Sequence, residues 1–391
     1  MDPAALAALR TPEGSDALSA AAAVAGADPL SAVTTLRSHG IAPDLAAAAL
    51  TQAELRAGAV GKFGPDAARM WFTRAGLEQA TRRVVANRRA GRLVAAGVTH
   101  IADLGCGIGS DTIAFARAGI RVTAVDADPI TASVAAANVA ALGLGHLATV
   151  RTATADSVDL DAVDAAFCDP ARRRPTGRVF DPNAYSPPWT FVTSLATAVP
   201  ATVVKVAPGI DHALVPDGAE AEWVSVDGDV VEAALWCGPL ATVARRATLL
   251  TGSAEAVLVG PGTAAAPVGP IGRYVYDPDG AVVRSHLVAE FAATVAGRLG
   301  DTTIAYVYTD VHIASPFGRA YEIHDVMPFS LKRLRAAMRE RGIGRLTIKK
   351  RGSALEPSQL RRDLKLHGSG ELTIILTRVA GAPTVLLCSP R

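Results

Sequence analysis

The chain of 391 residues is poor in cysteine, in aromatic residues and in net charge. Its four cysteines lie far apart, form no C-x-x-C pair and have no histidine at metal-ligand spacing, so the sequence predicts neither a disulfide framework nor a metal site. The 35 glycines and 24 prolines follow no fixed period, which excludes a collagen-like rod. Half of the residues are hydrophobic and only 19% are charged, a core-forming composition that excludes wholesale disorder.

Long apolar runs are also missing, and we expect no leader segment. The apolar stretch LSAAAAVAGADPL is broken by Asp28 and Pro29, and no uninterrupted apolar run reaches membrane-spanning length. The N-terminal segment MDPAALAALR has an acid at position 2 and no basic n-region, unlike a signal peptide. We therefore expect a soluble protein of the reducing cytoplasm, with no membrane partner.

Two patterns follow one another in the first 240 residues. Residues 1–60 alternate Ala- and Leu-rich runs with short breaks, which predicts a helical region; Asp44 and Gly58 stand where the caps of its last helix are expected. Within residues 61–240, short β-branched runs alternate with helical stretches from about residue 98 onward. This alternation is typical of an α/β fold with a mostly parallel, doubly wound sheet.

The sheet is expected to end differently from how it begins. The segment AEWVSVDGDVVEAALWCG predicts two strands around a turn at Asp227-Gly228, which makes an antiparallel hairpin. Residues 241–318 carry further strand-like pieces, such as GRYVYDPDGAVV, and predict a β-rich connecting region. Residues 319–391 predict a small α+β domain.

Basic residues are concentrated in this C-terminal part. Between Arg319 and Arg378 there are 14 basic and 6 acidic residues, a net charge of +8, so the rest of the chain sums to −6. The segments SLKRLRAAMRERG and PSQLRRDLKLHG predict basic amphipathic helices, and the run Lys349-Lys350-Arg351 follows a predicted strand. These three cations are candidates for contacts with backbone phosphates, or they form a solvated surface. Because aromatic residues are scarce here, RNA recognition would depend on shape and phosphates.

The motif with the clearest chemistry is DLGCGIGSD, which closes a predicted strand and opens a predicted helix. Gly105, Gly107 and Gly109 let the backbone approach a nucleoside closely, and Asp103 at the lip suits a cationic group better than a pyrophosphate. A dinucleotide fingerprint would need glycine at position 110, where the chain has serine. Asp126 ends the next predicted strand, where a carboxylate can accept ribose hydroxyls.

This arrangement resembles the class I S-adenosylmethionine (SAM) dependent methyltransferases. The resemblance implies a Rossmann-like sheet of seven strands with a terminal antiparallel hairpin. It also implies SAM as cofactor, contacted by Asp103, the three glycines and Asp126. Asp156, after the third predicted strand, resembles the family's acid near the adenine amino group, but it can equally be a solvated loop residue.

A second motif, Asp169-Pro170-Ala171-Arg172-Arg173, follows the fourth predicted strand, where this family positions its methyl acceptor. It resembles the [DNS]-P-P-[YFW] motif of methyltransferases that act on exocyclic base nitrogens, and this implies catalytic roles for Asp169 and Pro170. The motif departs from that pattern at its third and fourth positions. Arg172 and Arg173 are candidates for stacking on a base or binding phosphate, or they lie in a solvated loop. A D-P-A-R run also occurs in RNA uridine C5-methyltransferases, but those need a cysteine after the fifth strand, where this chain reads KVAPGIDH.

Two further segments resemble RNA-modifying proteins. The lead-in from Lys62-Phe63-Gly64 to Thr81 resembles that of trimethylguanosine synthase-like RNA methyltransferases, which implies Gln79 and Thr81 as cofactor contacts; helix surface and core is the alternative. The C-terminal block resembles the THUMP-like domain of a group of bacterial methyltransferases.

The prediction for the whole chain is a SAM-dependent methyltransferase that acts on structured RNA, tRNA or rRNA, by in-line SN2 transfer. One alternative is a SAM-binding RNA-interaction protein with little catalysis. The other is a methyltransferase with a non-RNA substrate.

Overall fold

The computed structural model describes residues 3–24, 26, 28–170, 173–174, 177–178 and 186–391. The chain forms two compact units. The first contains residues 1–206, 216–219 and 235–241; the second contains residues 207–215, 220–234 and 242–391.

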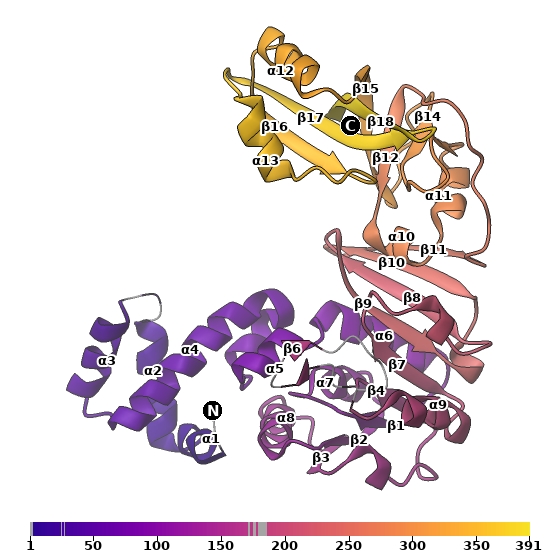
Figure 1. The fold of residues 1–391 in the computed structure, drawn as a ribbon. Coiled ribbons are helices and arrows are strands. Elements are labelled where there is room, and N and C mark those ends of the chain that lie inside the picture. Colours follow the sequence, from indigo (N-terminus) through magenta and orange to yellow (C-terminus); the bar gives the residue numbers. More distant parts are fainter. Residues whose placement is uncertain (1–2, 25, 27, 171–172, 175–176, 179–185) are drawn as a thin grey trace. The chain divides into compact units, whose positions relative to one another are not determined.

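The first unit begins with helices, as the sequence predicts (Figure 1). They are α1 (Pro3–Leu9), α2 (Pro12–Ala23), α3 (Pro29–Ser38), α4 (Pro43–Phe63), α5 (Arg74–Gln79) and α6 (Arg83–Ala95). The first four each begin at a proline, whose fixed φ suits the first helical turn and whose missing N–H costs nothing there.

The predicted caps of α4 are wrong. The helix begins at Pro43, so Asp44 lies in its first turn, and it continues past Gly58 to Phe63, also crossing the predicted domain boundary at residue 60. The buried residues of α4 keep the helical spacing beyond Gly58, whose own position faces solvent, so packing extends the helix. Gly64, with φ 59°, ends it.

The α/β sheet has the predicted topology (Figure 1). Its strands are β1 (His100–Leu104), β2 (Arg121–Asp126), β3 (Ala148–Thr152), β4 (Ala165–Cys168), β7 (Thr202–Val206), β8 (Glu220–Val226), β9 (Asp229–Trp236), β10 (Arg245–Thr251) and β11 (Ala254–Gly260). The order β3-β2-β1-β4-β7-β9-β8-β10-β11 holds the seven predicted strands, with two further strands beside β8. The pairs among β3, β2, β1, β4 and β7 are all parallel.

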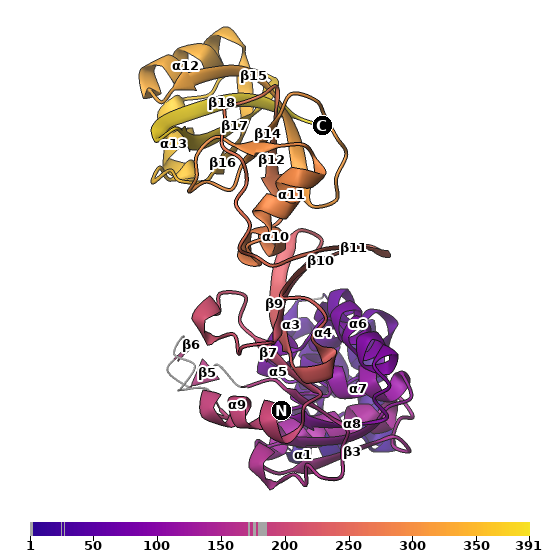
Figure 2. The same cartoon turned by 90° about the vertical axis from the view of Figure 1, so that its right-hand side faces the viewer.

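The helices cover both faces of the parallel strands. Helices α7 (Ser110–Arg117) and α8 (Pro129–Ala141) follow β1 and β2 on one side, and α9 (Trp189–Ala198) precedes β7 on the other (Figure 2). Asp128 caps α8 by accepting the Thr131 amide, a role suited to an aspartate directly before the proline of the first helical turn. A short ribbon of β5 (Arg173–Arg174) and β6 (Gly177–Arg178) lies between β4 and α9 in the chain.

The predicted hairpin turn is confirmed in the second unit. Asp227 and Gly228 both have positive φ, 52° and 91°, between β8 and β9. Two left-handed residues in a two-residue turn match the right-handed twist of the strands, which is why Asp-Gly is favoured there.

A second sheet forms the rest of the second unit. Its strands are β12 (Tyr274–Pro278), β13 (Arg298–Leu299), β14 (Val307–Thr309), β15 (Gly318–Pro328), β16 (Ile343–Lys350), β17 (Gly370–Val379) and β18 (Ala382–Pro390), in the order β13-β14-β12-β15-β18-β17-β16. Its helices are α10 (Gly280–Arg284), α11 (Val288–Thr294), α12 (Leu331–Glu340) and α13 (Pro357–Leu364). The first three of these strands come from residues 241–318, which are therefore shared between two sheets.

One predicted strand is partly wrong. The run GRYVYDPDGAVV stops being a strand at Pro278, because Asp279 accepts the amide of Ala281 and starts α10.

The core of this sheet explains why β17 has an unbroken apolar run. Ile374 and Leu376 pack with Leu334 and Met338 of α12 on one face. Ile375 packs with a tyrosine-rich cluster on the other face. Alternate residues of a strand point to opposite faces, so a strand buried on both sides needs apolar residues throughout.

Candidate active site

The glycine loop after β1 is built for close approach of a ligand. Gly105, Gly107 and Gly109 have φ values of 87°, 58° and 87°, a region that favours glycine. A Cβ on Gly105 would lie 3.0 Å from the carbonyl oxygen of Asp169, so this glycine lets the loops after β1 and β4 touch. A Cβ on Gly107 would meet nothing within 4 Å, so that side of the loop is open.

Asp126 fixes this loop from the end of β2. Its Oδ2 accepts the amide of Gly107 at 3.0 Å and its Oδ1 accepts the amide of Asp128 at 2.9 Å. Burial raises the pKa of this carboxyl, and the two amides counteract the shift. Each carboxylate oxygen keeps a lone pair for another donor, which is what binding to a ribose diol requires.

Asp103 is fully buried on β1 at the base of the loop. Its Oδ2 accepts the hydroxyl of Thr112 at 2.5 Å, whereas its Oδ1 has no hydrogen-bond partner among the described residues. Burial, followed by the neighbouring charge of Asp111, raises the pKa of Asp103 to about 8. An unpaired buried carboxyl oxygen is costly, and a cationic ligand group would relieve that cost.

Asp169 stands directly after β4 and is paired with a lysine from the next strand. Lys205 of β7 places its Nζ 2.6 Å from Asp169 Oδ2, and the two side chains are 6% and 25% exposed. Strands β4 and β7 are parallel neighbours. Their adjacent carboxyl ends therefore bring these residues together, and the acid is held at one oxygen while part of it faces solvent.

Behind this pair lies a buried chain of polar contacts. Lys205 Nζ also donates to Thr81 Oγ1 at 2.9 Å, and Thr81 donates to Asp111 Oδ2 at 2.7 Å. Asp111 in turn forms an ion pair with Arg89 of α6, whose guanidinium lies over the ring of Phe167. Buried charges need paired groups around them, so this series of polar contacts fixes Lys205, and through it Asp169.

Gln79 and Thr81, the two predicted cofactor contacts before the sheet, differ in burial. Thr81 is buried in the polar chain just described, while Gln79 is exposed at the end of α5. Lys62 fastens this segment, because its Nζ donates to the carbonyl oxygens of Leu77 at 2.6 Å and Glu78 at 2.8 Å. Burial lowers the pKa of Lys62 to about 8. Direct contact of Gln79 or Thr81 with a cofactor stays a prediction.

The other residues predicted around the loops are also placed. Asp156 is exposed in the short 3-10 turn that follows β3, on the same sheet edge as Asp126. Pro170 is buried directly behind Asp169. Arg172 lies outside the described residues, and of Arg173 only the backbone, in β5, is described. Their predicted roles stay predictions.

The run Lys349-Lys350-Arg351 is engaged in ion pairs. Lys349 and Arg351 both contact Asp277, at 2.8 and 2.9 Å, and Lys350 contacts Glu356 at 2.8 Å. The three cations that the sequence predicts as phosphate contacts are thus already paired with carboxylates of the protein. Their role as substrate contacts stays a prediction, with less charge available for it.

Sequence reasoning did not single out Lys205, Arg89 or the role of Asp111. Lys205 reads as one more residue of the strand TVVKV, and Arg89 as part of a basic helix face. A charged residue inside an otherwise apolar, five-residue buried strand was the available signal for Lys205, because lysine is rarely buried unless it is paired.

No helix among the described residues is long and apolar enough to cross a membrane. The same residues contain no group of three or more His, Cys, Asp or Glu side chains arranged to hold a metal ion.

Comparison with known proteins finds related domains and related whole chains. Residues 101–172 match a methyltransferase domain, residues 318–390 match a THUMP domain-like family, and residues 2–59 match a domain of unknown function. Two Mycobacterium tuberculosis proteins, from strains CDC 1551 and H37Rv, are described as uncharacterized S-adenosylmethionine-dependent methyltransferases. Each is 34% identical to this chain over 345 residues, covering 85% of this chain and 93% of its own length.

One solved structure shares the fold over nearly the whole chain. A candidate methyltransferase from Porphyromonas gingivalis W83 superposes with a TM-score of 0.76 at 22% identity, covering 96% of this chain and 98% of its own. The donor set fits the cofactor of such proteins. The unpaired Oδ1 of Asp103 suits its ammonium, Asp126 suits its ribose, and the open side of Gly107 leaves room for it.

Proposed function

This chain belongs to the family of S-adenosylmethionine-dependent methyltransferases, and from that premise we propose that its methyl acceptor is a structured RNA, such as a tRNA or rRNA. The bound cofactor supplies an electrophilic methyl group on a sulfonium. The protein's contribution is therefore to position the acceptor and to exclude water.

The observation that carries the catalytic part is the position of Asp169. Its backbone carbonyl lies against Gly105 of the cofactor loop, and its carboxylate is held by Lys205 at 2.6 Å. We assign Oδ1, which has no partner among the described residues, as the acceptor for an N–H or O–H of the substrate. Such a hydrogen bond aims the lone pair of the attacking atom and balances the positive charge that develops on it.

Lys205 has a matching role in this proposal. An ammonium at one carboxylate oxygen fixes the rotamer of Asp169. The buried hydrogen bond to Thr81, which is itself held by Asp111, prevents Lys205 from moving away. Asp169 therefore acts as a fixed hydrogen-bond acceptor, and Pro170 stiffens the backbone that carries it.

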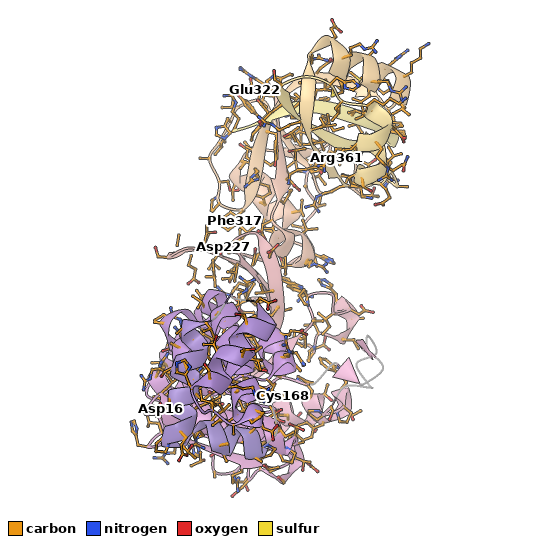
Figure 3. The ribbon with its side chains drawn as sticks, turned by 90° about the vertical axis from the view of Figure 1, so that its left-hand side faces the viewer. Asp16, Cys168, Asp227, Phe317, Glu322 and Arg361 are labelled. Atoms are coloured by element: carbon orange, nitrogen blue, oxygen red, sulfur yellow. The ribbon has the colours of Figure 1, made fainter. Side chains whose placement is uncertain are left out.

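The RNA part is supported by the surface of helices α12 and α13. Their apolar residues, including Leu334, Met338 and Leu364, are buried under the sheet. Exposed cations with no carboxylate partner among the described residues remain on their outer sides: Lys332, Arg333, Arg339, Arg361 and Lys365 (Figure 3, where Arg361 is labelled). Clustered exposed cations attract a polyanion and release its counterions on binding.

Methyl-labelled SAM and total RNA from cells that lack this gene test the proposal. Label in one RNA size class is the expected result, and its nucleoside composition then identifies the modified atom. Asp169→Asn, which keeps the shape of the side chain, serves as the matched control and should incorporate almost no label.

The altered D-P-A-R motif favours one second candidate, a SAM-binding protein that holds RNA with little catalysis. Crosslinking to RNA together with no incorporated label would support it. A substrate other than RNA would appear instead as turnover that is insensitive to salt and to the α12 and α13 cations.

A further inference from the structure

Three aromatic rings are stacked within the second unit, and none of them has been assigned a role so far. Trp223 of β8 is fully buried and stacks on His212 with ring centroids 5.0 Å apart and an interplanar angle of 15°. His212 stacks in turn on His286, at 3.8 Å and 9°. His286 follows α10, which packs on β8 (Figure 1), and it is exposed.

We propose that His286 is the outer ring of a platform on which an unpaired base of an RNA substrate stacks. This inference rests on the proposed RNA acceptor and adds a base-binding site to it. Single-stranded bases are commonly held on aromatic or imidazole rings, because every base presents a π-face.

The backbone at His286 is the first argument. Its φ is 62°, a left-handed conformation that costs a non-glycine residue on the order of 1 kcal/mol. The neighbours Ser285 and Leu287 are both fully buried, so the chain is anchored on each side and the imidazole is directed outward. Among the described residues the ring makes no hydrogen bond, and its stacking on His212 is its one ring contact. This left-handed residue closes α10, where the amide of Leu287 donates to the carbonyl oxygen of Val282 at 3.0 Å, and the closing turn holds the exposed ring in place.

The state of His212 is the second argument. Burial, then the adjacent His286 and Arg245, lower the pKa of His212, against the opposing effects of the Arg284 backbone and Asp211, which favours the neutral ring. Its buried Nδ1 has no partner among the described residues. Face-to-face rings direct their nitrogens along parallel planes, so the pair is not arranged to share a metal ion. A neutral, rigid stack backed by tryptophan is suited to π-stacking.

The surrounding charge is the third argument and selects RNA as the occupant. Arg284 is exposed directly before this segment, and its Nη1 donates to the carbonyl oxygen of Pro208 at 3.3 Å. Half-buried Arg245 and exposed Asp211 act on His212 electrostatically in opposite directions. Two guanidinium groups beside a stacking ring provide what a nucleotide needs, namely phosphate contacts and a surface for the base.

Two fluorescein-labelled 12-mers, oligoadenylate and oligouridylate, test the platform by fluorescence anisotropy without any methyl donor. Because adenine stacks more strongly than uracil, the wild-type protein should prefer oligoadenylate. His286→Gly removes the ring and also relieves the left-handed backbone, so the variant stays folded. It should bind oligoadenylate about fivefold more weakly or worse and lose the preference. His286→Phe should retain it, and His146→Ala, an exposed histidine before β3, should behave as wild type.

The outcomes separate the two proposals. If His286→Gly binds both oligomers as the wild type does, the platform is overturned while RNA as substrate stands. If the wild type binds neither oligomer or shows no adenine preference, the platform is likewise overturned, and the labelling experiment still decides the RNA acceptor independently. Unchanged thermal melting and SAM affinity in His286→Gly confirm that the variant reports on binding.

Discussion

The cations around Asp169 and those on α12 and α13 are the same residue types in opposite environments. Lys205 and Arg89 are 5% and 2% exposed and are engaged by Asp169, Thr81 and Asp111. Lys332, Arg333 and Arg361 are exposed on helices whose apolar sides alone are buried.

The difference teaches what burial does to a charge. A buried cation has lost its hydration and is tied to fixed partners, so it holds geometry and is nearly insensitive to salt. An exposed cation costs little to keep and acts over a Debye length, so it attracts a polyanion but fixes no atom in place. Catalysis is expected to depend on the first group and RNA capture on the second.

The largest expected effect tests the buried side of this comparison. Asp169→Ala should lower turnover by about 1,000-fold, because it removes the group that orients the acceptor. SAM affinity should stay within about twofold, since the carboxylate is not among the groups that suit the cofactor. Single-turnover labelling and isothermal titration measure the two quantities. An equal loss of both would show that Asp169 is a cofactor or folding residue.

Replacing Lys205, the partner of Asp169 in this ion pair, should have the next largest effect. Lys205→Met leaves Asp169 without its ammonium and should lower turnover about 100-fold. It should also lower the free energy of unfolding by about 2 kcal/mol, because an unpaired, partly buried acid remains. The double variant Lys205→Met with Asp169→Asn should recover most of that stability but not the turnover. If the double variant did not recover stability, Lys205 would stabilise the protein through packing and not through its charge.

The exposed side is tested by removing charge without touching the buried chain. Arg333→Ala, Arg361→Ala and Lys365→Ala together should weaken RNA binding about tenfold and reduce the slope of log affinity against log salt by about 2. SAM affinity should be unchanged. A triple variant of the ion-paired Arg345, Lys350 and Arg391 removes the same charge and serves as control. If the control variant lost more RNA affinity than the first triple variant, the RNA-binding surface would include the ion-paired residues instead.

The smallest effect concerns the buried acid Asp103, whose pKa is raised to about 8. A carboxyl with a raised pKa stabilises the fold fully below its ordinary pKa, and this contribution is lost as the pH rises through about 8. Asp103→Asn has no such titration. Its melting temperature should therefore gain a few degrees on the wild type between pH 6 and pH 9, while SAM binding weakens. If the melting temperatures of the variant and the wild type differed by the same amount at every pH in this range, the titration of Asp103 would not affect stability.

Much of the molecule was predictable because local chemistry sets it. The glycine loop needs left-handed φ values that only glycine adopts easily, and Asp227-Gly228 is the pair that a two-residue hairpin turn prefers. The period of the apolar residues predicted α12 as an amphipathic helix, and its Leu334 and Met338 are buried in the core. By contrast, Gly58 misled the prediction of where α4 ends, because tertiary packing outweighed its low helix propensity.

The amino-acid sequence by itself determined the parallel sheet with its hairpin, the cofactor loop and the basic character of the C-terminal domain. Only the tertiary structure decided which charges meet. Lys205 is 36 residues from Asp169 and 124 from Thr81 in the chain, yet its ammonium contacts both. Likewise, Lys349 and Arg351 are 72 and 74 residues from Asp277, yet both form ion pairs with this one carboxylate. Periodicity reports which face of an element is buried, whereas pairing between elements depends on strand order and register, which bring distant residues together.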